Sequence, residues 1–272
     1  RLGMPVVQTE HNNHKGYTKE GRIANGVSNV LANTVVCVSE SVRESFPRWE
    51  RAITNSRKVR VIDNGVDTGR IEETADIRWS IHEAAEIDPE AVVVGSAGLL
   101  TEQKAHDVLI DAVDRANADS ERPIELVISG DGPLREPLDA QIAAAEHSDR
   151  LHLLGFLEKR AQVYQMMRDV DIYAMPSRWE GFCVAALEAM AVGNACVFSD
   201  IEEFTRPFSE VALFHPVDDP ATLAERLLEL ATDDRKRDSY RNVAHDLVHR
   251  QYTLHQTAER YIQTYRDCLP SE

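Results

Sequence analysis

Two glutamates eight residues apart are the most informative polar residues of this chain. Glu180 precedes a turn of small residues, and Glu188 lies within the almost wholly apolar run Ala185–Ala191. A carboxylate among apolar side chains is expected to be partly buried, and a buried charge is costly unless something binds it. The pattern therefore indicates either a pair of ligand-binding carboxylates or, alternatively, a core glutamate whose bonds are satisfied within the protein.

The separation of the two carboxylates limits their chemistry. If the residues between them are mostly helical, a rise of ~1.5 Å per residue puts them on the order of 12 Å apart. Paired carboxylates of glycoside hydrolases lie ~5–5.5 Å or ~6.5–9.5 Å apart, so this spacing is too long for that mechanism. It suits the two ends of a nucleotide diphosphate sugar. Glu188 would accept hydrogen bonds from ribose hydroxyls, and Glu180 from sugar hydroxyls.

The segment between the glutamates is predicted to hold the diphosphate. Gly181, Phe182 and Cys183, followed by Val184, lead into a helix. Backbone amides at a helix N-terminus attract anions, so these amides would point toward the phosphates.

A second turn offers a positive charge. Gly98 to Lys104 follows the strand expected at Ala91–Ala97 and leads into a helix that begins near Ala105. Anions bind where such a turn meets a helix, and Lys104 would add a mobile charge for a phosphate. An ordinary strand–helix turn with a solvated lysine is the alternative.

Three further motifs are less specific. His11 follows the first strand and so faces the ligand-binding edge of a parallel sheet, unless it is merely structural or exposed. Gly130–Pro133 is a tight turn that lacks the third glycine of a dinucleotide-binding fingerprint. Asp169 and Asp171 have the spacing of a metal-binding pair, but Asp171 opens a strand, so we predict no metal site.

Composition excludes several classes of protein. The chain has 272 residues and 43% hydrophobic residues, which indicates a globular protein with ample core. Its net charge of -16 repels phosphate backbones and argues against nucleic-acid binding. This acidic composition also fits solubility at high salt. No run approaches the ~20 apolar residues of a membrane span. The four cysteines have neither metal nor disulfide spacing, and we expect reduced thiols of a cytoplasmic protein.

Short apolar runs alternate with amphipathic stretches along the chain, which predicts an α/β protein with a Rossmann-like, doubly wound parallel sheet. The expected strands are Pro5–Thr9, Thr34–Val38, Lys58–Ile62, Ala91–Ala97, Ile124–Ser129, Leu151–Leu154, Asp171–Met175 and Ala195–Ser199. The turn Asp63–Asp67 divides about two strand–helix units from five or six. We therefore expect a partial Rossmann-like domain at residues 1–64, a complete one at 65–253 and a final helix at 254–272 that crosses back to the first.

Taken together, these pieces resemble the retaining glycosyltransferases of family 4 (glycosyl transferases group 1), which have the two-domain GT-B fold. Val36–Glu40 resembles the last strand of the family's first domain, and Val61–Asp67 resembles the link between its domains. Gly98–Lys104, Gly130–Pro133 and Pro176–Gly193 resemble its donor domain in order and spacing. Two glutamates eight residues apart, after a Pro-Ser pair and with the second glutamate opening Glu-Ala-Met-Ala, are highly specific to this family.

The resemblance implies a retaining hexosyltransferase that takes its sugar from a nucleotide-diphosphate sugar and needs neither a metal nor another cofactor. Fixed positive groups would stabilise the leaving diphosphate. The expected acceptor is a carbohydrate or a lipid-linked molecule. The implied substrate-binding residues are Gly98, Lys104, Gly181, Phe182, Cys183, Val184 and Glu188, and the implied catalytic residues are Glu180 and His11.

The chain departs from the family pattern at three places. Leu99 stands where the family usually has an arginine, Ala105 where it has a glycine, and Ile201–Phe204 where it has a glycine-rich loop. Residues 1–64 resemble only the end of the first domain, so we expect exposed apolar faces that favour partners or self-association. A truncated donor domain that binds nucleotide or a partner without catalysis is the alternative. A nucleotide-sugar epimerase or a phosphorylase fits the glutamate spacing less well.

Overall fold

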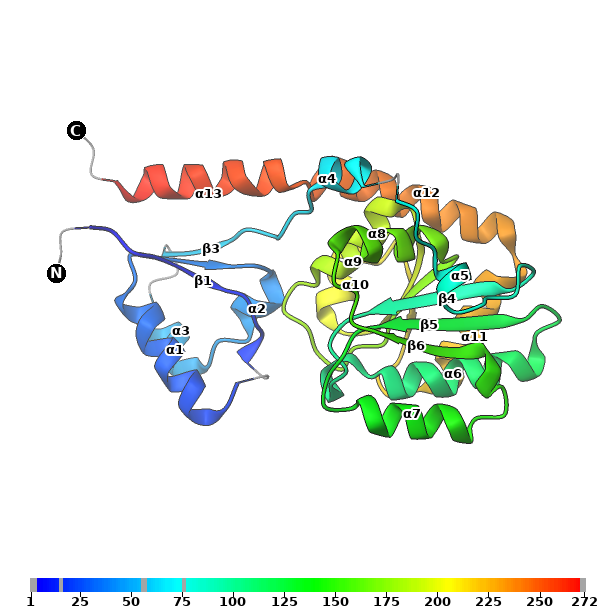
Figure 1. Cartoon of the computed structure of the whole chain (residues 1–272). Coiled ribbons are helices and arrows are strands. Elements are labelled where there is room, and N and C mark those ends of the chain that lie inside the picture. Colours follow the sequence, from blue (N-terminus) through cyan, green and yellow to red (C-terminus); the bar gives the residue numbers. More distant parts are fainter. Residues whose placement is uncertain (1–3, 15–16, 55–57, 75–76, 270–272) are drawn as a thin grey trace.

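The fold contains two parallel β-sheets, which are joined by the segment that follows residue 61 (Figure 1). The structure, a computed structural model, describes residues 4–14, 17–54, 58–74 and 77–269. The smaller sheet has the strand order β1-β2-β3. Its strands and helices are β1 (Val7–Glu10), α1 (Lys19–Leu31), β2 (Thr34–Cys37), α2 (Glu40–Glu44), α3 (Arg48–Ile53) and β3 (Val59–Val61).

The larger sheet has six parallel strands in the order β6-β5-β4-β7-β8-β9. This is the strand order of a doubly wound nucleotide-binding sheet. From β4 the chain adds strands toward one edge up to β6, and then from β7 toward the other edge, so the switch point lies between β4 and β7. The strands are β4 (Val92–Ala97), β5 (Ile124–Ser129), β6 (Leu151–Gly155), β7 (Ile172–Met175), β8 (Ala195–Ser199) and β9 (Leu213–His215). The predicted α/β class and all eight predicted strands are confirmed. The edge strand β9 was not predicted.

Helices cover both faces of the larger sheet (Figure 1). Its helices are α4 (Thr68–Glu73), α5 (Ile81–Ala84), α6 (His106–Asp119), α7 (Arg135–Ala144), α8 (Arg160–Asp169), α9 (Val184–Val192), α10 (Glu202–Phe208), α11 (Pro220–Thr232) and α12 (Asp234–Gln251). One buried cluster packs α6, α7 and α11 against the sheet, and the other packs α8, α9 and α12 against the opposite face. The acids Asp169 and Asp171 accept backbone N–H bonds from Ile81 and Val93, so both have structural roles here.

The last helix, α13 (Leu254–Cys268), runs back over the smaller sheet (Figure 1). It begins beside the segment that links the two sheets, where Val66 and Thr253 form a β-bridge. Arg60 of β3 forms an ion pair with Asp267 at 2.7 Å. The last helix therefore contacts both the link and β3, while the predicted division at 64 and 253 into two domains and a returning helix stays a proposal.

Part of the smaller sheet's surface is apolar and exposed, as expected. β1 pairs with β2 alone among the described residues, which leaves one edge of the sheet open. On the neighbouring helix α1, Ile23, Val27 and Leu31 follow at helical spacing and are 59%, 48% and 77% exposed.

The crossing of the link and α13 depends on a glycine. A Cβ added to Gly65 would lie 2.3 Å from the carbonyl oxygen of Thr253, so Gly65→Ala must push the two backbones apart. We expect the free energy of unfolding, measured by urea denaturation, to fall by about 1–3 kcal/mol. Gly69→Ala in α4 is the control, because its Cβ would come no closer than 3.6 Å to Asp67 and alanine favours a helix. Equal midpoints for both variants would contradict the packing argument.

Candidate functional site

A cavity of about 480 Å³ opens at the carboxyl ends of β4 and β7, where the strand order reverses. Ligands of open α/β sheets bind in this crevice. The residues that line it come from the turns after β4, β5, β6 and β7 and from the starts of α8 and α9. They are Ala97, Gly98, Leu99, Lys104, Ser129, Gly130, Asp131, Phe156, Leu157, Arg160, Val163, Met167, Glu180, Phe182, Cys183, Val184, Ala185 and Glu188.

Two glycines after β5 support the turn after β4. A Cβ on Gly130 would lie 1.8 Å from the carbonyl oxygen of Gly98, and one on Gly132 would lie 2.6 Å from that of Leu100. The amide of Leu100 donates to the carbonyl of Asp131 at 3.0 Å. The turn after β5 therefore acts as a support for the Gly98–Lys104 turn rather than as a phosphate-binding fingerprint.

Glu180 is buried and tied to the β4 turn. Its Oε1 accepts a hydrogen bond from Lys104 Nζ at 2.6 Å and another from the Ser177 hydroxyl at 2.8 Å. Its Oε2 has a weaker contact with Gln103 at 3.4 Å. Burial works to lower the pKa of Lys104, but the interactions with Cys183 and with the Glu180 carboxylate outweigh it, and the pKa is raised. The lysine therefore stays charged inside the cavity.

Glu188 is held in the same way from the other side of the cavity. Its Oε1 accepts hydrogen bonds from Arg160 and from the Tyr164 hydroxyl, the latter at 3.0 Å. Among the described residues, its Oε2 has no hydrogen-bond partner. Sequence reasoning missed both Arg160 and Tyr164. Their spacing of four residues on one helix was visible, but nothing in the sequence showed that α8 faces Glu188.

The helix between the glutamates, α9, begins at Val184 and has Cys183 as its N-cap. Gly181 and Phe182, whose amides were also expected at the N-terminus of this helix, precede it. Phe182, Cys183 and Val184 still line the cavity. Burial, and then Glu180, raise the pKa of the Cys183 thiol to about 11, so the thiol is neutral near pH 7.

Gly181 and His11 do not line this cavity; they meet behind it. A Cβ on Gly181 would lie 2.0 Å from the carbonyl oxygen of His11, so the turn that carries Glu180 presses on the loop after β1. The Ser39 hydroxyl donates to the Gly181 carbonyl at 3.0 Å. The side chain of His11 is exposed. The turn that carries Glu180 therefore contacts the backbone of His11 through Gly181, and the catalytic roles of Glu180 and His11 stay a prediction.

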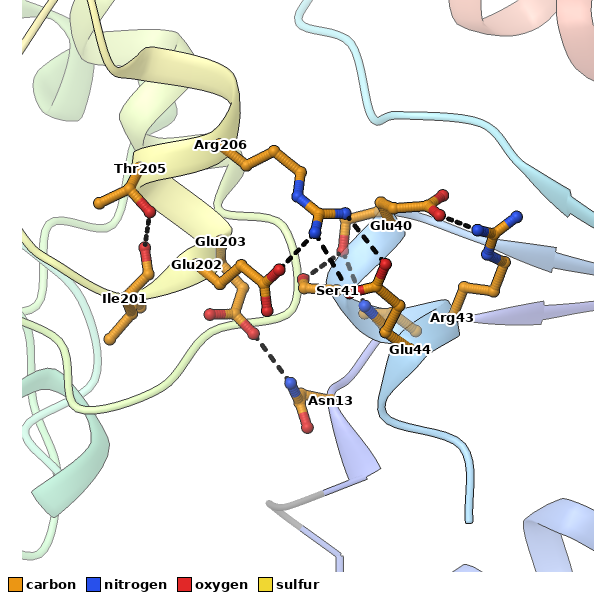
Figure 2. A network of polar contacts seen from close by, with 12 residues as sticks. Asn13, Glu40, Ser41, Arg43, Glu44, Ile201, Glu202, Glu203, Thr205 and Arg206 are labelled. Carbon is orange, nitrogen blue, oxygen red and sulfur yellow. Dashed lines mark hydrogen bonds and ion pairs between the residues drawn. The ribbon is translucent and has the colours of Figure 1, made fainter. Parts of the chain in front are cut away.

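A polar network joins α10 to the smaller sheet (Figure 2). Asn13 donates to Glu203 at 2.8 Å, and Arg206 pairs with Glu44 at 3.1 Å. A second cavity of about 300 Å³ lies beside this network and shares Phe182 with the first. The segment that replaces the family's glycine-rich loop therefore forms a helix that contacts the smaller sheet.

The other two departures have clear structural consequences. Leu99 is 67% exposed and lines the cavity without a charge. Ala105 has φ +51°, a left-handed conformation that glycine adopts more readily.

Comparison with known proteins agrees with this geometry. The family model of glycosyl transferases group 1 matches residues 77–246. The O-antigen biosynthesis glycosyltransferase WclY of Escherichia coli is 24% identical over 78% of this chain and 56% of its own length. The D-inositol 3-phosphate glycosyltransferase of Jonesia denitrificans is 26% identical over 97% of this chain and 66% of its own length. The chain spans about half the length of the first curated relatives it matches.

Solved structures share the fold. Anabaena HepE in complex with UDP and glucose has a TM-score of 0.83 at 19% identity, covering 97% of this chain and 72% of that one. The pneumococcal O-GlcNAc transferase GtfA, in complex with UDP and GlcNAc, has a TM-score of 0.77 at 16% identity, covering 98% and 53%. No helix in the described ranges is both long and apolar enough to cross a membrane. The family model matches more than half of the chain, and the solved structures share its two-sheet GT-B fold. This chain therefore belongs to the group 1 glycosyltransferases.

Proposed function

We propose that this chain binds a nucleotide-diphosphate sugar in the 480 Å³ cavity and transfers the sugar to an acceptor hydroxyl with retention of configuration. One observation carries the proposal. Two buried glutamates line a single cavity at the switch point, and each has Oε1 tied by a cation and a hydroxyl. Their Oε2 atoms remain weakly bonded or without a protein partner, which suits them to accept bonds from ligand hydroxyls.

We propose a separate role for each of the groups that line the cavity. We assign the ribose hydroxyls to Glu188 and the transferred sugar to Glu180. The diphosphate would lie between them, on Lys104 and the start of α9 at Val184, where a helix N-terminus favours negative charge. Gly98 leaves room for this, since it places no side chain between the lysine and the ligand.

The proposed reaction places the acceptor hydroxyl on the face of the sugar from which the diphosphate leaves. The bond between the anomeric carbon and the phosphate oxygen breaks as the new glycosidic bond forms, and the proton of the acceptor hydroxyl passes to the departing phosphate oxygen. Lys104 stabilises charge on the departing diphosphate, which is electrostatic catalysis by a preorganised group. His11 lies on the loop that Gly181 contacts, so we place it on the acceptor side. Retention and independence of metal rest on the family resemblance.

Acceptor and location are proposals of the same kind. The relatives' names include O-antigen biosynthesis and lipopolysaccharide core biosynthesis, which supports a carbohydrate or lipid-linked acceptor. The four cysteines are free thiols, which supports a cytoplasmic location. Self-association through the open edge of β1 and the apolar face of α1 stays a prediction.

A nucleotide-binding domain without transferase activity is the second candidate. The charged residues lining the cavity favour it, because Asp131, Glu180 and Glu188 outnumber Lys104 and Arg160. Such a balance leaves little positive charge to stabilise the departing diphosphate, which disfavours transfer. Release of free nucleoside diphosphate from a bound donor would support transfer, while binding without release would favour the second candidate.

Glu188→Gln tests the ribose contact. We expect calorimetric titration with UDP, GDP and ADP to show about tenfold weaker binding of the preferred nucleotide, because a bond to a charged group is worth ~1.5–3 kcal/mol. The wild-type protein should prefer that nucleotide to its 2′,3′-dideoxy form, and the variant should lose this preference. The exposed Glu136→Gln is the control. An unchanged ribose preference would refute the assignment of Glu188.

Glu180→Gln tests the sugar contact. With one carboxylate fewer, Lys104 keeps its charge for the diphosphate, so donor affinity should stay within about threefold. Transfer to water, followed as release of nucleoside diphosphate from the preferred donor, should slow by about a hundredfold, or ~2.7 kcal/mol of transition-state stabilisation. The exposed Glu210→Gln should behave as wild type. If release by the Glu180 variant is as fast as wild type, Glu180 has no catalytic role.

Leu99→Arg tests the charge deficit of the cavity. A guanidinium at this exposed position would add a charge-assisted bond to the diphosphate and raise donor affinity by about tenfold or more. The gain should shrink as salt is added, because salt screens exposed charges. Leu99→Gln, with similar length and no charge, should show no such gain. Equal affinities for the two variants would argue that phosphate does not reach this turn.

A further inference from the structure

A bound diphosphate needs more positive charge than the Gly98–Lys104 turn of the donor cavity supplies. Two esterified phosphates carry two negative charges, and Lys104 offers one positive charge that Glu180 already partly neutralises at 2.6 Å. Leu99 offers none. Among the described residues that line the cavity, the other cation is Arg160.

Arg160 is placed and shaped for a second phosphate contact. It is the first residue of α8, and its guanidinium bonds Glu188 while lying 5.1 Å from the ring centre of Tyr164. A guanidinium has five N–H donors in a plane, so the bond to Glu188 leaves others available. The side chain is 46% exposed and lines the cavity. A long guanidinium side chain beside the ribose-binding carboxylate can reach toward the first phosphate, because that phosphate is esterified to the 5′ carbon of the same ribose.

We propose that Arg160 is a diphosphate-binding residue of the donor site, which bridges Glu188 to the phosphates and supplies the charge that Leu99 lacks. This proposal rests on the proposed function of the cavity. The guanidinium keeps its bond to Glu188 Oε1 and donates a second N–H to a phosphate oxygen, while Glu188 Oε2 accepts from the ribose. Two cations then hold the diphosphate from opposite turns, Lys104 after β4 and Arg160 after β6.

A purely structural role makes a different prediction. If Arg160 only orients Glu188, its loss weakens the ribose contact, and the effect is the same for a nucleoside and for its diphosphate. If Arg160 also binds phosphate, its loss costs more as phosphates are added. The ratio of affinities along the series nucleoside, monophosphate and diphosphate therefore separates the two roles.

The experiment titrates the wild-type chain with UDP, GDP and ADP, then follows the tightest of them with its monophosphate and nucleoside. We expect Arg160→Gln to weaken diphosphate binding about tenfold or more and nucleoside binding by less than about threefold. Arg160→Lys, which keeps the charge but not the fork of donors, should lie between wild type and Arg160→Gln. Leu99→Arg added to Arg160→Gln should recover diphosphate affinity. Thermal unfolding of each variant checks that it is folded.

The outcomes separate the phosphate role of Arg160 from the proposed function of the cavity, on which that role rests. If the wild type binds none of the nucleotides, the proposed function fails and this inference fails with it. If the wild type binds a diphosphate with a ribose preference, but Arg160→Gln loses nucleoside and diphosphate affinity equally or loses neither, the donor site stands and the phosphate role of Arg160 is overturned.

Discussion

The site depends on one repeated arrangement: a buried carboxylate whose Oε1 is fixed by a cation and a hydroxyl. For Glu180 the partners are Lys104 and Ser177, and for Glu188 they are Arg160 and Tyr164. Burying a carboxylate without partners would cost several kcal/mol, so these bonds are what allow both buried glutamates to line the cavity. The same bonds fix the direction of the second oxygen, which preorganises it for a ligand.

The sheet brings these partners together from distant parts of the chain. Lys104 follows β4, Arg160 follows β6, and both glutamates follow β7, whose place beside β4 is where the strand order reverses. The turn after β5 can pack against the turn after β4 because Gly130 and Gly132 have no side chains where they meet the carbonyl oxygens of Gly98 and Leu100. The geometry of the site is thus a consequence of strand order and of close backbone contacts, and each turn is of little use without its neighbours.

The sequence was informative where a pattern is local. The eight strands, the cavity turn after β4 and the paired glutamates were all visible in short stretches such as Ala91–Ala97, and the alternation of strands and helices predicted the sheet. Partners that meet across the fold were not visible. Arg160 and Tyr164 became readable only when α8 was placed opposite α9, and the start of α9 at Val184 depended on a turn whose geometry is set by contact with the β1 loop.

The smaller sheet takes part in the site through backbone contact more than through side chains. Gly181 follows Glu180 directly and meets the carbonyl of His11 at a distance that no residue with a Cβ could reach, so the direction of Glu180 and the position of the β1 loop are set together. That loop is itself anchored by buried polar groups, since His14 lies against Phe46 and within 4.0 Å of both Glu10 and Glu50. Burial lowers the pKa of His14 and raises those of the two acids, which favours neutral forms in this cluster. A shift of the smaller sheet would therefore displace the turn that carries Glu180. The two sheets are also joined by α13, by the bond from Asn13 to Glu203 and by the ion pair of Arg206 with Glu44.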